Sequence, residues 1–346
     1  RTNGQFISAC NFVPVNCAKG VDPKTGRPIE NPEARYYKTG KPFIGTPGAS
    51  GAHSWHPMAF DPKQKLVFIP AQIASFPYIA AKDWKPAAQG FNVGTDFAAV
   101  AMPADKAVRA AAMAATRGQL IAWDPVTQQA RWHIDSPGPP NGGLLATAGG
   151  LLFQGTARGD FNAYSSRDGK KLWSFPAQTG IVAPPVTFAV GKDQYVAVLA
   201  GWGGIWALAP GLLAQKSGPA RNASRLLVFR LGGTAKLPVE PPVDPTPLDP
   251  PRATAPASVV AEGGALFGRF CGTCHGDAAV GGGLLPDLRR SGALADPNAW
   301  KLIVHDGALR DNGMVSWSNV MSTQQIETIR HYVIKRANED KGLDAP

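Results

Sequence analysis

The chain contains 346 residues, of which 44% are hydrophobic and 17% charged, with 39 glycines and 32 prolines. This composition excludes a coiled coil, a helical bundle and a disordered chain, and it favours many short strands joined by tight turns. The length predicts at least two domains, and no apolar run is long enough for a membrane-spanning helix. The formal net charge is +10, and the basic residues are scattered without a basic run. This argues against a nucleic-acid partner and favours docking to an acidic partner protein.

Two features precede the regular part of the chain. The stretch between Cys10 and Cys17 is long enough to let the two thiols meet, so an oxidising compartment would allow a disulfide. The alternative, two free buried thiols, is the one we expect. An alanine-rich stretch at residues 98–116 predicts a helix that lies on the face of the strand-rich domain.

The middle of the chain contains an internal repeat. Residues 118–134 align without gaps on residues 159–175, and each copy predicts a strand, a turn and a returning strand that ends in Trp132 or Trp173. A period near 40 residues with this pattern is typical of a β-propeller blade. A WD40 propeller would place Gly-His before the blade and Trp-Asp at its end, and neither is found there.

The same template matches residues 2–7, which predict the turn and returning strand of a further hairpin. Residues 1–235 are then expected to hold three to four blades, too few to close a propeller. Since an open half would expose unpaired strand edges, we expect a missing N-terminal part of the propeller, as a separate chain or a lost segment. Eight prolines within residues 238–256 predict a stiff linker at residues 236–257.

The remaining domain, residues 258–346, contains a haem-attachment motif near its beginning. Cys271 and Cys274 have the CxxC spacing with which two thiols add to the two vinyl groups of haem, and His275 follows directly as an iron ligand. A redox dithiol or half of a zinc site is the alternative for a CxxC alone, but no second CxxC follows. The motif therefore predicts covalent haem c in a small all-α, class I-like cytochrome c.

Two methionines beyond the motif are candidates for the sixth iron ligand. Met314 lies in a turn-rich loop and is the predicted ligand. Met321 precedes a capping box and the apolar face of the last predicted helix, so it is expected to pack against that helix. A histidine or an open site remains the alternative. Further helices are expected before the motif, around residues 265–270, and at residues 300–304.

The repeat, the proline-rich linker and the CxxCH motif together resemble the quinohaemoprotein alcohol dehydrogenases, over essentially the whole chain. The resemblance implies an eight-bladed propeller in which each repeat tryptophan donates its N–H to a backbone carbonyl of the next blade. It also implies that the carbonyl of Pro286 accepts the N–H of His275, the alternative being a simple turn proline. Family-like stretches are residues 29–36, 55–58, 142–144, 153–156 and 201–204.

In this family the propeller holds pyrroloquinoline quinone (PQQ) and Ca²⁺. The resemblance implies that Ser54, Trp55, Trp202 and Gly203 contact PQQ, with propeller packing as the alternative for both stretches. Ser54 stands where the family has asparagine, which puts that hydrogen bond in doubt. The family's Ca²⁺ ligands and its aspartate base have no counterpart here, so no catalytic residue is expected in this chain.

The expected function is oxidation of an alcohol by PQQ and Ca²⁺ in the periplasm. Electrons would pass through haem c to an acceptor such as a small cytochrome or a blue-copper protein. Two alternatives stay open. One is an electron-transfer cytochrome with a non-catalytic docking propeller, and the other is a quinohaemoprotein dehydrogenase for polymeric or cyclic substrates.

Overall fold

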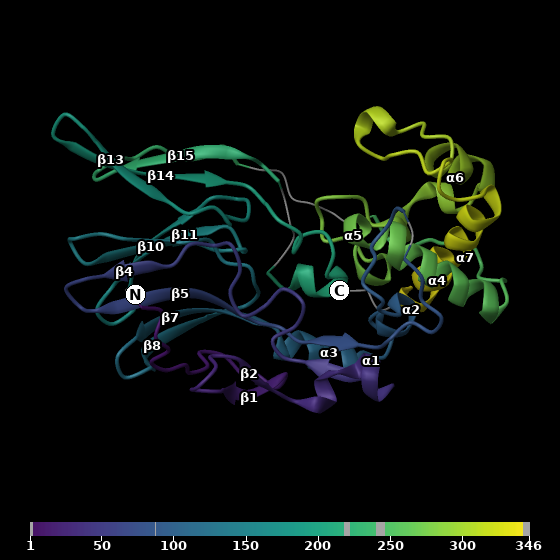
Figure 1. Cartoon of the computed structure of the whole chain (residues 1–346). Coiled ribbons are helices and arrows are strands. Elements are labelled where there is room, and N and C mark those ends of the chain that lie inside the picture. Colours follow the sequence, from purple (N-terminus) through teal and green to yellow (C-terminus); the bar gives the residue numbers. More distant parts are fainter. Residues whose placement is uncertain (1–2, 87, 218–221, 240–245, 342–346) are drawn as a thin grey trace. The chain divides into compact units, whose positions relative to one another are not determined.

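The computed structural model describes residues 3–86, 88–217, 222–239 and 246–341, which form two compact units (Figure 1). The strand unit comprises residues 1–78, 111–206 and 216–241, and the helical unit comprises residues 79–110, 207–215 and 242–346. The single helix predicted for the alanine-rich stretch on the strand-rich domain is wrong: the stretch forms two helices, α2 (Phe97–Val100) and α3 (Lys106–Ala115), and its residues up to 110 belong to the helical unit. Residues 79–110 and 207–215 thus join the helical unit although they lie before the proline-rich linker in the chain.

Every ladder between the strands of the described strand unit is antiparallel. Four-stranded sheets form in the orders β4-β5-β7-β8 and β12-β11-β10-β9, a three-stranded sheet in the order β13-β14-β15, and two-stranded sheets from β1-β2 and β3-β6. The bounds are β1 (Ala18–Val21), β2 (Pro28–Glu30), β3 (Phe43–Gly45), β4 (Ala59–Asp61), β5 (Leu66–Ile73), β6 (Phe76–Tyr78), β7 (Arg117–Asp124), β8 (Gln129–Ser136), β9 (Leu144–Ala146), β10 (Leu151–Gly155), β11 (Asp160–Ser165), β12 (Lys171–Pro176), β13 (Val186–Val190), β14 (Asp193–Ala200) and β15 (Arg225–Arg230).

The internal repeat is confirmed as two hairpins, β7–β8 and β11–β12, each within its own four-stranded sheet. The hairpin predicted at the start of the chain is wrong for the described residues, because residues 3–17 contain no strand. A strand exists only where a neighbour completes its hydrogen bonds, and none of the described sheets includes this stretch as a strand. Val13 instead packs on apolar side chains of β5 and β7. Cys10 and Cys17 are free, as expected, but exposed rather than buried.

The sheets stack with apolar cores between them (Figure 1). Phe68 of β5 and Leu120 of β7 pack against Leu152 of β10. On the other side of that second sheet, Phe161 of β11 packs against Val198 of β14. Each of these side chains is at most 2% exposed. Because side chains alternate between the two faces of a strand, the second sheet packs against the first sheet on one face and against the third sheet on the other.

A tryptophan links the first two stacked sheets. Trp132 of β8 donates its indole N–H to the carbonyl oxygen of Arg167, in the β11–β12 turn, at 3.1 Å. Gly169 in that turn has φ +74°, and a Cβ there would lie 2.8 Å from the Trp132 ring. Only glycine combines this conformation with room for the ring. The hydrogen bond implied by the family resemblance is therefore present for Trp132.

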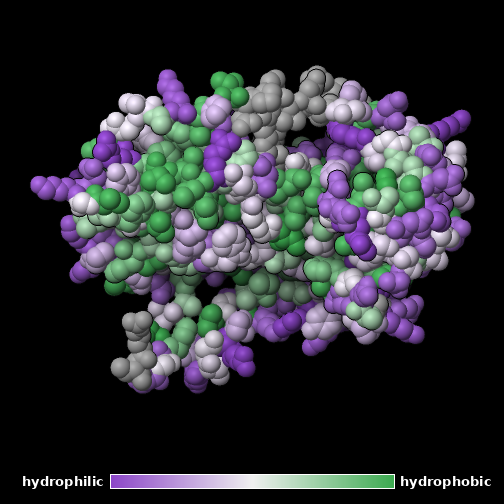
Figure 2. Space-filling model, turned by 90° about the horizontal axis from the view of Figure 1, so that it is seen from above, coloured by the Kyte–Doolittle hydropathy of each residue, from purple (hydrophilic) through white to green (hydrophobic). Residues whose placement is uncertain are grey.

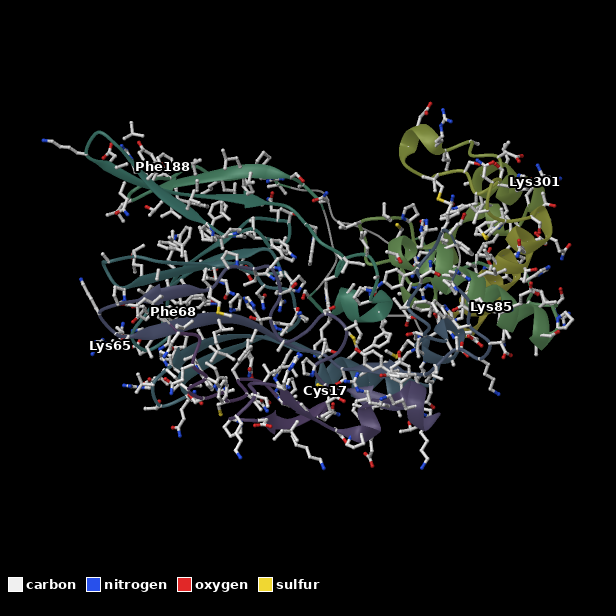
Figure 3. The ribbon with its side chains drawn as sticks, viewed as in Figure 1. Cys17, Lys65, Phe68, Lys85, Phe188 and Lys301 are labelled. Atoms are coloured by element: carbon white, nitrogen blue, oxygen red, sulfur yellow. The ribbon has the colours of Figure 1, made fainter. Side chains whose placement is uncertain are left out.

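The outer face of the third sheet is apolar and exposed. Phe188 of β13 is 43% exposed and stacks on Tyr195 of β14. Figure 3 shows Phe188 on this sheet and Phe68 within the stack, and Figure 2 shows the apolar area from above. Exposed apolar side chains of the three strands are Val186, Phe188, Val190, Leu199, Leu226 and Val228. A patch of this kind is unusual on a free surface.

The helical unit packs α4 (Ala257–Phe270), α6 (Pro297–Val304) and α7 (Thr323–Asp340) around one core. The predicted capping box at the start of α7 is present, with Ser322 and Gln325 bonding each other's backbone N–H. Gly263 of α4 faces the Thr328 carbonyl so closely that a Cβ would clash. Shorter elements are α5 (Gly272–His275), η3 (Asp277–Ala279), η4 (Leu288–Arg290), η5 (Gly292–Leu294) and η6 (Arg310–Asn312). Of the helices described, none has the length and apolarity to span a membrane.

The link between the first two sheets is testable. Replacing Trp132 with phenylalanine keeps an aromatic side chain but removes the pyrrole part of the indole with its donor to the Arg167 carbonyl, so we expect a loss of at least about 1 kcal/mol in the free energy of unfolding. Urea unfolding of the full-length protein measures it. Val126→Ala, at a side chain that is 84% exposed, is the control and should change stability little. Equal stability of Trp132→Phe and the parent would show that the hydrogen bond contributes nothing.

Candidate functional site

The two motif cysteines lie at the junction between α4 and α5. Cys271 caps the end of α4, and its carbonyl accepts the N–H of Cys274 at 3.1 Å and of His275 at 2.9 Å. This single turn fixes the spacing of the three reactive side chains. Both cysteines are free; Cys271 is buried and Cys274 exposed. Burial raises the pKa of the Cys271 thiol to about 12, so the buried sulfur is held as a thiol.

His275 is oriented by the loop that follows. Its side chain is 8% exposed, and Nδ1 lies 3.1 Å from the carbonyl oxygen of Pro286. A carbonyl only accepts hydrogen bonds, so Nδ1 carries the proton and Nε2 presents a lone pair to a metal. Burial lowers the pKa of His275, partly opposed by the Pro286 carbonyl and by Asp287. The predicted contact of Pro286 is thus present, and it holds a neutral imidazole in the tautomer that iron needs.

The two candidate methionines have different surroundings. Met321 is 3% exposed and belongs to the core of the helical unit, beside the root of α7. Met314 is half-buried at the edge of that core. Its loop is closed by two bonds to the end of α6: Ser316 Oγ donates to the His305 carbonyl at 2.6 Å, and the N–H of Trp317 donates to the Val304 carbonyl at 3.0 Å. A thioether at the core's edge is the more accessible ligand.

In the strand unit, distant stretches of the sequence come together. A Cβ on Gly204 would lie 3.5 Å from Nε1 of Trp55, and one on Gly143 would lie 2.5 Å from the Pro57 ring. The N–H of Leu144 also donates to the Pro57 carbonyl at 3.0 Å. Three of the family-like stretches therefore adjoin each other, and their glycines permit the close approach.

This region contains buried polar atoms without hydrogen-bond partners. Nε2 of His56 and Nε1 of Trp202 are buried and have no hydrogen-bond partner among the described residues. The ring of Trp202 lies over Gly180, where a Cβ would be 2.5 Å away. His56 stacks on Trp55 with ring centroids 4.1 Å apart, and Trp55 itself is 55% exposed. Unpaired buried groups are costly, so an indole N–H and an imidazole nitrogen beside an accessible indole fit an aromatic ligand with polar edge groups.

Comparison with known proteins agrees with both halves of this geometry. Residues 99–196 match the family described as glucose/ethanol/alcohol dehydrogenase, beta-propeller domain, and residues 258–333 match the family described as cytochrome c oxidase, cbb3-type, subunit III. The dehydrogenase subunit of the quinone alcohol dehydrogenase of Acetobacter aceti is 44% identical over 337 residues, covering 97% of this chain and 45% of the relative. This chain is a relative of the quinohaemoprotein alcohol dehydrogenases.

Two further relatives show how far the likeness extends. The solved structure of quinohaemoprotein alcohol dehydrogenase ADHIIG from Pseudomonas putida is 38% identical with a TM-score of 0.89, over 98% of this chain and 49% of that one. Lupanine 17-hydroxylase [cytochrome c] from a Pseudomonas species is 40% identical over 97% of this chain and 46% of the relative. The chain spans about half the length of the curated relatives it matches. The strand unit is accordingly part of a β-propeller, and the helical unit is a cytochrome c domain.

The charge of the quinohaemoprotein chain is divided unevenly. The strand unit holds 21 of the 35 Lys and Arg residues and 10 of the 25 Asp and Glu residues, which leaves 14 and 15 for the helical unit. The positive charge is thus a property of the strand unit.

Several charged residues that contribute to the structure around the haem motif were not identified from the sequence. Asp277 is half-buried, and its carboxylate accepts the N–H of Met102 at 2.8 Å; desolvation raises its pKa to about 6. Asp340, at the end of α7, is fully buried between Arg109 and Arg289. No local pattern distinguishes these residues, because their partners come from distant segments of the chain.

The buried His56 predicts an acid-dependent loss of stability. Burial, and to a lesser extent His53, lowers the pKa of His56 from 6.5 to about 4. The folded protein therefore binds fewer protons than the unfolded chain, and this contribution is present above about pH 6.5 and lost as the pH falls through 4. The shift corresponds to about 3 kcal/mol. Urea unfolding between these pH values should show a flatter profile for His56→Gln than for the parent. An identical slope in the two proteins would contradict the assignment.

Proposed function

We propose that this chain carries the haem c domain and part of the PQQ site of a periplasmic quinohaemoprotein alcohol dehydrogenase. The observation that carries the proposal is the similarity to a quinone-dependent alcohol dehydrogenase subunit over 97% of the chain, through both units. The whole enzyme would oxidise an alcohol and pass the electrons through haem c to a periplasmic acceptor, such as a small cytochrome or a blue-copper protein.

Haem c would be held by residues of the helical unit. Cys271 and Cys274 would form the two thioether bonds, and His275 and Met314 would be the axial ligands. The Pro286 contact of His275 and the half-buried position of Met314 support this set. A histidine–methionine pair favours the reduced iron and raises its potential, which suits an electron carrier.

PQQ would lie beside the adjoining stretches of the strand unit. When bound, it supplies the two-electron acceptor for alcohol oxidation. Trp55 would offer its exposed indole face, and Trp202 its unpaired indole N–H. Gly203 would let the backbone approach, and the exposed Ser54 would contact the quinone edge with a shorter side chain than the family's asparagine. The Ca²⁺ ligands and the catalytic base would come from elsewhere in the propeller.

Further propeller sequence is the proposed partner of the third sheet. The exposed apolar face of β13–β15 suits another sheet, as the inner interfaces of the stack do. The relatives are about twice as long as this chain, and a propeller needs a neighbour for every blade. Burial of this face would remove the large apolar patch from water.

The choice between the two methionines is tested by substitution. Met314→Ala should abolish the thioether-to-iron charge-transfer band of the oxidised protein, because it removes the proposed ligand. Met321→Ala should keep the band but lower stability by about 2–5 kcal/mol, because it opens a cavity in the core. Absorption spectra and urea unfolding of both variants measure this. Loss of the band only in Met321→Ala would reverse the assignment.

The activity is tested in the complete dehydrogenase loaded with both cofactors, in which the rest of the propeller supplies the Ca²⁺ ligands and the catalytic base. A primary alcohol should reduce the haem within the turnover time. The matched control is a Cys271→Ala, Cys274→Ala variant, which should retain PQQ but show no haem reduction. Reduction of PQQ without haem in the parent would contradict the relay. No reaction with any alcohol would favour the docking cytochrome, and reaction only with a cyclic amine such as lupanine would favour the other dehydrogenase class.

A further inference from the structure

A buried charge network joins the end of α7 to the loop beyond the haem motif. Asp340, which is fully buried, accepts one hydrogen bond on each carboxylate oxygen: from Arg109 at 2.6 Å and from Arg289 at 2.7 Å. Arg289 is 4% exposed. Charge-assisted bonds of this kind have well-defined directions, so Asp340 determines where the guanidinium of Arg289 lies.

Arg289 in turn holds Asp287. Its Nε donates to Oδ1 of Asp287 at 2.9 Å and its Nη2 donates to Oδ2 at 2.6 Å, which makes a bidentate pair. The backbone N–H of Arg289 also donates to Oδ1 at 3.1 Å. Asp287 directly follows Pro286, whose carbonyl accepts the ring N–H of His275. The network thus ends one residue from the group that orients the proximal histidine.

Regular structure begins only after Pro286. Residues 280–287 form neither helix nor strand, and Asp287 is the N-cap of η4, where its carbonyl accepts the N–H of Arg290 at 3.0 Å. Nε of Arg290 also lies 3.8 Å from Oδ2 of Asp287. Close packing helps on one side, because a Cβ on Gly281 would lie 2.9 Å from Cα of Asp287. Buried ion pairs are poor stabilisers compared with apolar packing, since desolvation offsets much of their attraction. What they supply here is a fixed geometry.

We propose that Asp340 and Arg289 are positioning residues for the proximal haem ligand, an inference that rests on the proposed haem site. By fixing the peptide of Pro286 and Asp287, they set the strength of the hydrogen bond from Nδ1 of His275. A histidine that donates a stronger hydrogen bond is a more basic ligand and favours ferric iron. The end of α7 therefore sets the reduction potential of a haem whose ligands all lie elsewhere in the chain.

The experiment compares three variants of the haem-loaded full-length protein. Asp340→Asn removes the charge that both arginines need, and Arg289→Lys keeps the charge but loses the bidentate pair. Glu339→Gln is the matched control, because it removes a neighbouring charge that pairs with Lys335 and Arg336 and not with Arg289. The readouts are hydrogen exchange of the His275 ring N–H by NMR in the reduced state, and the reduction potential by optical titration.

Ring N–H exchange should be about tenfold faster in Asp340→Asn and Arg289→Lys, as expected when a hydrogen bond is weakened, and unchanged in Glu339→Gln. The potential should rise in both test variants. If Arg289→Lys shows the exchange rate and the potential of the parent, the network has only a structural role. This variant keeps the charge, so it decides the question alone if Asp340→Asn does not fold. A parent chain without covalent haem after denaturation would instead overturn the proposed function, and this inference with it.

Discussion

The hydrogen bond from His275 to the Pro286 carbonyl is the point at which the separate parts of the helical unit meet. The end of α4 and the single turn of α5 present the two thiols and the imidazole, but they leave the ring free to rotate. Its orientation comes from a loop without regular structure, which is held by ion pairs to the end of α7. The local motif thus supplies the reactive groups, and distant packing supplies their geometry. This division explains why one contact at 3.1 Å depends on residues from most of the unit.

The strand unit obeys a different constraint, because each of its three stacked sheets is apolar on both faces and needs two neighbours. Phe161 illustrates the consequence, since it is fully buried between the second and third sheets. The stacking also creates the candidate quinone region. The stretches around Trp55 and Trp202 are far apart in the sequence. They adjoin the first and the third sheets of the stack, and they lie close together in the structure. The candidate quinone region therefore depends on the stacking of the sheets. The exposed face of β13–β15 is a face of the stack that no described sheet covers.

Features set by local chemistry could be predicted from the sequence. The two repeat hairpins, the haem motif and the capping box of α7 each follow from a short run of residues, and each is present. The strand expected near Phe6 fails because a strand depends on a partner that sequence spacing does not reveal. The inclusion of residues 79–110 in the helical unit and the burial of Asp340 share one cause. Both depend on contacts between segments that are distant in the chain, and a single sequence carries no periodicity that reports such contacts.

The division of the chain into two units also changes how its net charge is interpreted. The net charge of +10 suggests a molecule that attracts acidic partners over its whole surface. Electrostatic steering acts only over about one Debye length, roughly 8–10 Å at physiological salt, so what matters is the charge of the unit that a partner approaches. The strand unit carries that excess, whereas the helical unit is nearly neutral and pairs many of its charges internally. Long-range attraction of acidic molecules is therefore a property of the strand unit rather than of the whole surface.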